Sequence, residues 1–337
     1  MYLNNALVTG GAGFIGSHLS DKLVICNDVE EVRVFDNLSS GCINPNLLHC
    51  INSKHFRFIK GDLKDINSVG NALKNITTVF HLAAYPEVRT GFTSPELPYN
   101  ENIRNTFYLL EKIRKSSNVE SIVFSSSSTV YGEPEIIPTP ENYGAIIPIS
   151  AYGASKLACE ALISSYCHTY GIKGWIYRLA NVVGARSRHG IIFDFTKKLM
   201  NNNKEMVVLG NGLQSKSYIH ISDCITCMLF CLRSNACNNG NAQRVKIFNI
   251  GNDDNIDVFS IAKIICNTMG LEDVKLITTS GWNNDGRGWI GDVKHMQLDI
   301  SKLKRLGWNP KLSSEEAVRL SSKEILSFER QLTISES

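Results

Sequence analysis

The sequence predicts an α/β protein with a doubly wound parallel sheet, followed by a smaller α+β lobe. Short apolar strands alternate with amphipathic helical segments up to about residue 181, and this alternation breaks afterwards. A glycine-rich turn joins the first expected strand to the first expected helix. Alternation at this rhythm is typical of a parallel sheet with helices on both faces. We therefore expect one domain over residues 1–181 and a second over residues 182–330, with the chain crossing between them.

Hydrophobic periodicity sets the individual elements. In the first half it predicts strands at residues 6–8, 32–35, 56–59, 78–82, 121–124 and 174–179, and helices at 13–23, 66–73, 96–115 and 151–170. In the second half, strands are expected at 206–209, 218–221 and 246–250, and helices at 223–232 and 258–269. The elements of the second half follow no regular alternation, which favours an α+β lobe there.

Composition excludes several classes of protein. A chain of 337 residues, 43% of them hydrophobic, is large enough to bury a substantial core. The formal net charge of +3 is too small to indicate a nucleic-acid partner. The strand pattern begins at Ala6, which leaves no room for a signal peptide, and no apolar run reaches the roughly 18 residues that span a membrane. We expect a cytoplasmic protein without nucleic-acid or membrane partners.

Three of the ten cysteines have a spacing that allows two interpretations. Cys224, Cys227 and Cys231 resemble a metal cluster, but the same spacing places them on one face of a helix in the apolar context ITCMLFC. No second CxxC pair supplies further ligands. We therefore expect reduced thiols packed in the core and no metal site.

The segment ALVTGGAGFIGSH contains the pattern Gly11-x-Gly13-x-x-Gly16, extended by Gly10, between a strand and a helix. Glycines there allow a tight turn, close approach of a pyrophosphate to the backbone, and close packing of helix on strand. The pyrophosphate then lies at the free N–H groups and positive dipole end of the helix. A glycine turn without a ligand is the alternative, but the pattern predicts a dinucleotide-binding, Rossmann-like domain.

Two carboxylates at strand ends refine this prediction. Asp36 follows Gly16 by about 20 residues, at the end of the second strand, where a carboxylate accepts hydrogen bonds from the adenosine ribose. It would repel a 2′-phosphate, and no Arg follows it, so the sequence favours NAD over NADP. Asp62 ends the third strand and is expected either to accept a hydrogen bond from the adenine amino group or to cap the next helix.

Tyr152 and Lys156 lie four residues apart near the start of a long helix, so they share one helix face. A phenol with a pKa near 10 is a poor base at neutral pH. We expect the Lys156 ammonium and a positive nicotinamide ring to stabilise the phenolate and lower the pKa of Tyr152. Tyr152 then takes a proton from a sugar hydroxyl while hydride leaves the same carbon. Outside a nucleotide-binding chain, such a pair on a helix would carry no information.

The polar run SSSST at residues 125–129 directly follows the fifth strand. It is either a solvated loop or part of a site, because open α/β sheets bind ligands at the carboxyl ends of their strands. In the second interpretation, a hydroxyl of this run hydrogen-bonds the reacting oxygen and shares its proton with Tyr152. A Ser–His–Asp hydrolase is not indicated, because the chain has no G-x-S-x-G elbow.

In order along the chain, TGGAGFIGSH, DNLSSG, GDL, FHLAA, SSSSTVYG and YGASK resemble the extended short-chain dehydrogenase/reductase superfamily. The closest likeness is to UDP-glucose 4-epimerases, particularly archaeal-type sequences with RLANVVG and a following RHG, and it runs from about residue 5 to Trp308. The resemblance implies catalytic roles for Ser127, Tyr152 and Lys156. It also implies NAD contacts at the glycine turn and along the first half: Gly10, Gly13, Phe14, Ile15, Gly16, Asp36, Asn37, Leu38, Ser39, Ser40, Gly41, Asp62, Leu63, Leu82, Ala83, Ala84, Asn102, Tyr152, Lys156 and Ala180.

The implied reaction transfers hydride from sugar C4 to NAD. The 4-keto sugar then rotates, and hydride returns to its other face, so NAD stays bound through each turnover. Nucleotide-sugar 4,6-dehydratases resemble this chain but carry Thr-Asp-Glu before VYG. Ser127, Ser128 and Thr129 offer neither carboxylate, so we do not expect water elimination.

The resemblance implies substrate contacts as well. Asn181 matches a position at the phosphates, and Lys216 stands where the family usually has Arg, keeping the charge but losing the bidentate fork. Arg287 and Asp292, in GRGWIGD, resemble an Arg-x-Gly-Asp element with two extra residues. The expected substrate residues are Ser127, Asn181, Lys216, Arg287 and Asp292, although Lys216 and Arg287 can also be plain surface charges. A position that often limits sugar size falls near Met296.

The expected function is NAD-dependent 4-epimerisation of a UDP-sugar, UDP-glucose or UDP-galactose. An epimerase for UDP-N-acetylglucosamine or UDP-glucuronate, or another nucleotide-sugar oxidoreductase such as a reductase, is the first alternative. A regulatory NAD-binding protein without catalysis is a second one, against which the intact Ser127, Tyr152 and Lys156 argue. The resemblance also implies a homodimer formed through helices near residues 100–115 and 151–170.

Overall fold

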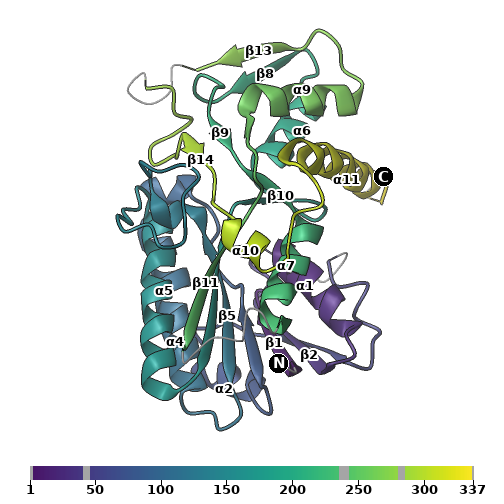
Figure 1. The fold of residues 1–337 in the computed structure, drawn as a ribbon. Helices are drawn as coiled ribbons and strands as arrows, with labels where there is room; N and C mark the ends of the chain where they lie inside the picture. Colours follow the sequence, from purple (N-terminus) through teal and green to yellow (C-terminus); the bar gives the residue numbers. More distant parts are fainter. Residues whose placement is uncertain (1–2, 41–45, 235–242, 280–284, 336–337) are drawn as a thin grey trace. The chain divides into compact units, whose positions relative to one another are not determined.

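The computed structural model describes residues 3–40, 46–234, 243–279 and 285–335, with side chains as far as residue 330 (Figure 1). The chain forms two compact units. The first consists of Met1–Val130, Ala151–Arg178 and Ile225–Phe248, and the second of Tyr131–Ser150, Leu179–Cys224 and Asn249–Ser337. This division differs from the ranges 1–181 and 182–330, because Tyr131–Ser150 belongs to the second unit and Ile225–Phe248 to the first.

A seven-stranded sheet has the order β11-β6-β5-β4-β1-β2-β3 (Figure 1). Its strands are β1 (Asn4–Thr9), β2 (Val29–Asp36), β3 (Phe56–Lys60), β4 (Thr78–His81), β5 (Ser121–Ser127), β6 (Lys173–Leu179) and β11 (Val245–Ile250). The pairs β3–β2, β2–β1, β1–β4 and β4–β5 are parallel, and the predicted α/β class is confirmed. After β3 the chain crosses to the other side of β1, so the strand order reverses between β1 and β4. Open α/β sheets bind ligands at such a point.

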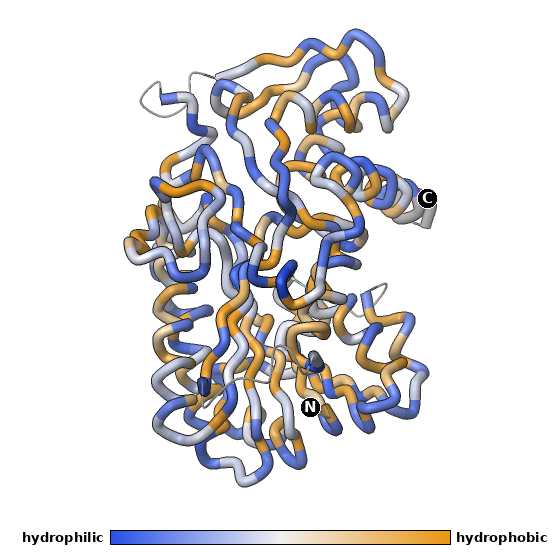
Figure 2. Tube along the Cα trace, viewed as in Figure 1, coloured by the Kyte–Doolittle hydropathy of each residue, from blue (hydrophilic) through white to orange (hydrophobic). Residues whose placement is uncertain are grey.

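The strands form because apolar residues run along them almost without interruption, as a sheet covered on both faces requires. All four residues of β4 are buried, and so are the last four of β1. Leu7, Val79 and Ile122, from β1, β4 and β5, pack in one cluster with Leu109 of α4 (Asn105–Ile113) and Ile163 of α5 (Ala151–Tyr170). Figure 2 shows these strands with long hydrophobic stretches. The cluster holds the strand ends in place, and with them the turns that follow.

The helix expected over residues 96–115 is not one regular α-helix. It consists of a short turn α3 (Glu96–Pro98), a π-helical segment at Tyr99–Arg104, and α4. π-Helical turns insert an extra residue and occur frequently at functional sites. Asn102 lies within this one, and its buried amide contacts both the backbone of Tyr85 and the side chain of Ser155.

The second unit contains small sheets of order β10-β7, β12-β9-β14 and β13-β8. Their strands are β7 (Asn181–Val183), β8 (Glu205–Val208), β9 (Ser215–Lys216), β10 (Tyr218–His220), β12 (Ile256–Asp257), β13 (Lys275–Thr278) and β14 (His295–Met296). Its helices are α6 (Ile191–Asn201), α9 (Val258–Met269), α10 (Ser301–Arg305) and α11 (Ser314–Ser335), while α7 (Ile221–Arg233) begins here and ends in the first unit. α9 is capped at its start by Asp257, whose carboxylate accepts from the Ser260 N–H, and at its end by the left-handed Gly270.

Helix α11 was not expected from the sequence. Val318 and Ile325 belong to the core of the second unit together with residues of α6 and α9. Between them, Ser321 and Ser322 are also buried, and their hydroxyls donate to the carbonyls one turn earlier. Because these two serines lie on the buried face, the apolar period of the helix is interrupted in the sequence.

The three cysteines of α7, Cys224, Cys227 and Cys231, are fully buried, in agreement with the expected core packing. Among the described residues, no group of three or more His, Cys, Asp or Glu is arranged to hold a metal ion. Within the same part of the chain, no helix is both long and apolar enough to cross a membrane.

Candidate active site

The turn after β1 leaves no room for side chains at Gly10 and Gly16. A Cβ atom on Gly10, which has a φ of +68°, would lie 2.6 Å from the Ala83 nitrogen. A Cβ on Gly16 would lie 2.2 Å from the Gly10 carbonyl oxygen. Gly13 is the N-cap of α1 (Phe14–Val24), and no side chain caps that helix end. The turn therefore presents bare backbone and the positive end of a helix, which fits a pyrophosphate group.

Asp36, at the end of β2, is tied to this turn. Its Oδ2 accepts from the Ala12 N–H at 2.9 Å, and its Oδ1 accepts from the Leu38 N–H at 2.7 Å. Burial raises the pKa of Asp36, and the two backbone hydrogen bonds oppose that shift. Each carboxylate oxygen has a second lone pair, so Asp36 can still accept hydrogen bonds from ribose hydroxyls. Asn46, which sequence reasoning missed, donates to the Ala12 carbonyl at 2.8 Å.

Asp62, which follows β3, lies beside Asn37 of the loop after β2. Asn37 Nδ2 donates to Asp62 Oδ2 at 2.9 Å, and the Lys64 N–H donates to Asp62 Oδ1 at the same distance. Burial works against ionisation of Asp62, but these hydrogen bonds outweigh it and its pKa is lowered. The alternative that Asp62 caps the next helix is wrong, because α2 (Ile66–Ala72) is capped by Asp65. Asp62 keeps acceptor capacity for an adenine amino group.

The other expected cofactor residues of the first unit lie at the same strand ends. Phe14 and Ile15 open α1. Leu38, Ser39 and Ser40 follow β2, Leu63 is buried after β3, and Leu82, Ala83 and Ala84 follow β4, where the Leu82 N–H donates to the Thr9 carbonyl at 3.1 Å. Gly41 lies outside the described residues. Ala180 belongs to the second unit, where its N–H donates to the Ile250 carbonyl at 2.8 Å.

Tyr152, Lys156 and Ser127 come together where β5 ends beside α5. The hydroxyls of Tyr152 and Ser127 are hydrogen-bonded. The buried Lys156 Nζ donates to the Ser125 carbonyl at 2.8 Å and lies 5.8 Å from the centre of the Tyr152 ring. The Thr129 hydroxyl donates to Ser127 Oγ at 2.9 Å, so the serine side chain is oriented from two sides.

The acidities of these groups differ from the sequence expectation. Burial raises the pKa of Tyr152 to about 12, although the hydrogen bond from Ser127 works in the opposite direction. Burial lowers the pKa of Lys156 to about 8, which leaves its amine mostly protonated at neutral pH. The expected lowering of the Tyr152 pKa depends on Lys156 together with a positive nicotinamide ring; without that ring, loss of hydration is the larger effect and the pKa is raised.

Asn102 and Ser155 support the same helix end. Asn102 Oδ1 accepts from the Tyr85 N–H at 2.7 Å, and its Nδ2 donates to Ser155 Oγ at 2.8 Å. Ser155 in turn donates to the Tyr152 carbonyl at 2.7 Å. Asn102 therefore joins the loop after β4 to the first turn of α5. Ser155 was not singled out in the sequence, because a serine inside a helix gives no signal by itself.

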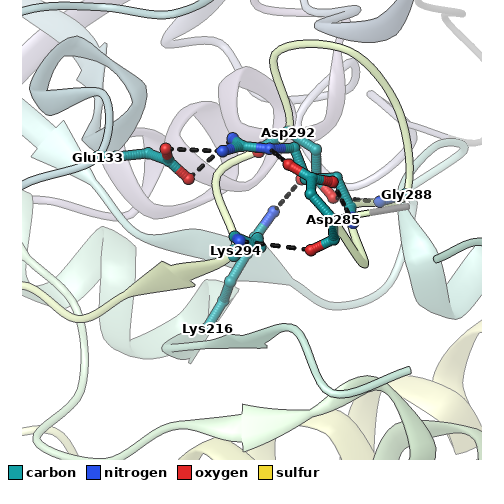
Figure 3. A network of polar contacts seen from close by, with 7 residues as sticks. Glu133, Lys216, Asp285, Gly288, Asp292 and Lys294 are labelled. Atoms are coloured by element: carbon teal, nitrogen blue, oxygen red, sulfur yellow. Dashed lines mark hydrogen bonds and ion pairs between the residues drawn. The ribbon is translucent and has the colours of Figure 1, made fainter. Parts of the chain in front are cut away.

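In the second unit, the two expected diphosphate cations are already paired with carboxylates. Lys216 Nζ lies 2.6 Å from Asp292 Oδ1, and it lies 5.6 Å from the centre of the Trp289 ring. Arg287 makes two contacts of 2.8 Å with the carboxylate oxygens of Glu133. Figure 3 shows Glu133 from one segment of the chain and Asp285 and Asp292 from one loop of another segment meeting at this cluster.

Glu133 and Asp285 were missed by sequence reasoning. Asp285 forms an ion pair with Arg287 Nε, and the Arg287 Nη1 donates to the Asp292 carbonyl at 3.0 Å. Pairing with Glu133, against a smaller effect of burial, raises the pKa of Arg287 further above its usual range, so it is charged at every relevant pH. The Asn181 side chain makes its hydrogen bond outside this cluster: its Nδ2 donates to the Ser217 carbonyl at 3.1 Å.

Comparison with known proteins adds independent information. Residues 7–321 match the family described as GDP-mannose 4,6 dehydratase. A Methanocaldococcus jannaschii protein named "Putative UDP-glucose 4-epimerase" is 33% identical over 320 residues, which cover 93% of this chain and 95% of that protein.

Solved structures agree with this match. A crystal structure of a UDP-galactose 4-epimerase has a TM-score of 0.82 and 38% identity, covering 96% of this chain and 99% of its own. A UDP-glucuronic acid 4-epimerase mutant from Bacillus cereus, in complex with UDP-4-deoxy-4-fluoro-glucuronic acid and NAD, has a TM-score of 0.82 and 26% identity, covering 96% and 99%. The chain therefore belongs to the GDP-mannose 4,6 dehydratase family, the NAD-dependent nucleotide-sugar epimerases and dehydratases of the extended short-chain dehydrogenase/reductase superfamily.

Proposed function

We propose that this protein is a UDP-sugar 4-epimerase that interconverts UDP-glucose and UDP-galactose through a 4-keto intermediate. The observation that carries the proposal is the arrangement at the end of β5, where Ser127 is hydrogen-bonded to Tyr152 beside the buried ammonium of Lys156. The relatives named as UDP-glucose and UDP-galactose 4-epimerases support the choice of reaction.

The first unit would hold NAD. The bare backbone between Gly10 and Gly16 and the uncapped start of α1 suit the pyrophosphate. Asp36 suits the adenosine ribose, and Asp62 the adenine amino group. When bound, NAD supplies a hydride acceptor and donor together with a positive ring charge. The NAD in the Bacillus cereus epimerase structure supports the same cofactor here.

Tyr152 would act as the acid and base at its Oη atom. It accepts the proton of the sugar 4-hydroxyl as hydride leaves C4, and it returns that proton when hydride comes back to the opposite face. Since burial raises the pKa of Tyr152 to about 12, positive charge is needed to stabilise its phenolate. Lys156 brings one such charge into a site shielded from water, and Ser127 donates a hydrogen bond to the reacting oxygen.

The second unit would supply the groups that bind the diphosphate. Asn181, Lys216, Arg287 and Asp292 are the candidates, and both cations already hold carboxylates of the chain. A diphosphate must therefore replace Glu133 at Arg287, an exchange of one bidentate anion for another. Met296 is buried and pairs in register with Lys216 between β14 and β9, which places the candidate size-limiting position next to the candidate phosphate cation.

The alternative is an epimerase for UDP-glucuronate or UDP-N-acetylglucosamine, or another nucleotide-sugar oxidoreductase. Solved structures named as 4-epimerases of UDP-glucuronic acid and of UDP-N-acetylglucosamine support the first two of these alike. A dehydratase, which the description of the family suggests, has less support, because Ser127, Ser128 and Thr129 offer no carboxylate for removal of water. We also propose a homodimer through α4 and α5.

The proposal is tested by incubating the purified protein with UDP-glucose, UDP-glucuronate and UDP-N-acetylglucosamine, without added NAD, and separating the 4-epimers. We expect UDP-galactose from UDP-glucose. Failure with every UDP-sugar refutes the epimerase proposal, and net NADH formation identifies a dehydrogenase instead. Tyr152→Phe should lose about 10²- to 10⁴-fold in kcat while retaining bound NAD, and a variant with full rate removes Tyr152 from the mechanism.

A further inference from the structure

A buried ion pair lies in the first unit next to the candidate active site. Glu160 of α5 is 5% exposed and Arg178 of β6 is 3% exposed. The guanidinium contacts both carboxylate oxygens, with Nη2 to Oε2 at 2.7 Å and Nε to Oε1 at 3.0 Å. The buried Ser126 hydroxyl also donates to Glu160. Buried ion pairs add little stability compared with apolar residues of similar volume, so packing alone does not account for this one.

Glu160 continues the row of Tyr152 and Lys156 along α5. The three residues are spaced four apart, so they lie on one face of the helix, one turn from each other. That face meets three consecutive residues at the end of β5. The contacts join the Ser127 hydroxyl to Tyr152, the Ser125 carbonyl to Lys156, and the Ser126 hydroxyl to Glu160. A shift of Ser126 therefore also moves its two neighbours, Ser127 and the Ser125 carbonyl, which contact Tyr152 and Lys156.

Glu160 also supplies the negative charge near Lys156. The titratable groups that act on or with Lys156 are Tyr152 and Cys159 on α5, His81 on β4 and Glu160, which is bound to Arg178 on β6. Burial lowers the pKa of His81 to about 3 and raises those of Tyr152 and Cys159, so these three are neutral near pH 7. Burial lowers the pKa of Lys156, and two charges act against that shift, first that of Cys159 once it is ionised and then that of the Glu160 carboxylate.

We propose that Glu160, held by Arg178, is a positioning residue of the active site. Through Ser126 it keeps the end of β5 aligned with α5, and through its charge it keeps the Lys156 amine protonated. This inference rests on the proposed function for the roles of Tyr152 and Lys156. It extends that function to a residue that touches neither the sugar nor the cofactor.

The test compares the pH dependence of kcat and the titration of Lys156 in the full-length NAD-bound protein. Glu160→Gln keeps the shape and the acceptor oxygen but removes the charge. We expect the alkaline limb of the kcat profile to move down by about one pH unit, because Lys156 then loses its proton earlier. The ¹³Cε chemical shift of Lys156, assigned with a Lys156→Arg sample, should titrate lower by the same amount.

A second variant, which removes both charges of the ion pair, controls for the possibility that Glu160→Gln fails to fold. Glu160→Gln leaves the Arg178 guanidinium buried without an anion, whereas Glu160→Leu combined with Arg178→Met removes both charges and keeps the volume. The double variant should also show a downward shift, smaller than that of Glu160→Gln, because it removes the Arg178 charge as well. The electrostatic half of the proposal is overturned if, in both variants, Lys156 titrates at the wild-type pH and the alkaline limb of the kcat profile also stays at the wild-type pH.

The alignment half is tested with Ser126→Ala and a matched control on the same strand. Ser121 is equally buried and its hydroxyl pairs with Thr78 at 3.0 Å, at the other end of β5. Ser126→Ala should lower kcat about tenfold or more, since small misplacements of catalytic groups are costly, and Ser121→Ala should not. Equal rates in the two variants refute the alignment role. A wild-type protein without epimerase activity refutes the proposed function, while the Lys156 titration still decides the inference.

Discussion

Replacing Glu133 by Gln should tighten the binding of uridine diphosphate. Glu133 contacts both Nη atoms of the Arg287 guanidinium at 2.8 Å, so a diphosphate that binds Arg287, as we propose, has to displace it. The Glu133 side chain is 39% exposed, and pairs this open to solvent contribute roughly 0.2–1 kcal/mol. Because Asp285 remains on the same guanidinium, we expect a gain of about 0.5 kcal/mol, which lowers Kd roughly twofold.

Isothermal titration of UDP into the NAD-bound protein measures this change. Glu135→Gln is the matched control, because Glu135 lies two residues along the same loop, is exposed, and loses the same charge without a contact to Arg287 in any described ion pair. The gain of Glu133→Gln over this control should shrink at high salt, as screening weakens the competing pair. Equal affinities, or weaker binding by Glu133→Gln, would mean that Glu133 orients Arg287 rather than competing for it.

Three further predictions concern the cofactor turn, acid stability and assembly. Gly16→Ala should lose bound NAD, because its Cβ would lie 2.2 Å from the Gly10 carbonyl oxygen. Gly144→Ala is the control and should keep NAD, because Gly144 has open space around it. The NAD content of the two purified proteins decides. Burial lowers the pKa of His81 from its ordinary 6.5 to about 3. Between these two pH values the unfolded chain binds a proton that the folded protein does not, so the free energy of unfolding falls as the pH drops from 6.5 towards 3. Urea unfolding should show a loss of at most about 1.4 kcal/mol per pH unit from this group, and His81→Gln should flatten the curve; an unchanged slope contradicts the assignment. Phe107, exposed on α4, should carry the dimer contact, so Phe107→Glu should give monomers in light scattering, and a wild-type monomer would remove the homodimer proposal.

Local motifs allowed much of the fold and cofactor region to be predicted. The glycine turn, the carboxylate at the end of β2 and the pair Tyr152 and Lys156 are encoded by residues close together in the sequence, and their geometry follows from strand and helix periods. The strands of the central sheet carry unbroken apolar runs, so they too are visible from the sequence. α11 was missed because buried serines interrupt its apolar face.

Contacts between distant segments could not be predicted in the same way. Glu160 meets Arg178 and Ser126, and Glu133 meets Arg287, across large separations along the chain. No spacing pattern records which of these side chains pair with each other, because an ion pair constrains only the relative position of two residues in the folded state. The same holds for the link between Asn102 and Ser155.

The sequence by itself determined the α/β class, the position of the glycine turn and the helix face shared by Tyr152 and Lys156, because each depends on short-range periodicity. Only the tertiary structure decided the acidity of those two residues. Burial raises the pKa of Tyr152 to about 12 and lowers that of Lys156 to about 8, so the charge of Lys156 by itself does not make Tyr152 acidic. Hydration is lost through packing of the whole unit, and no local spacing of residues records how much water a side chain gives up.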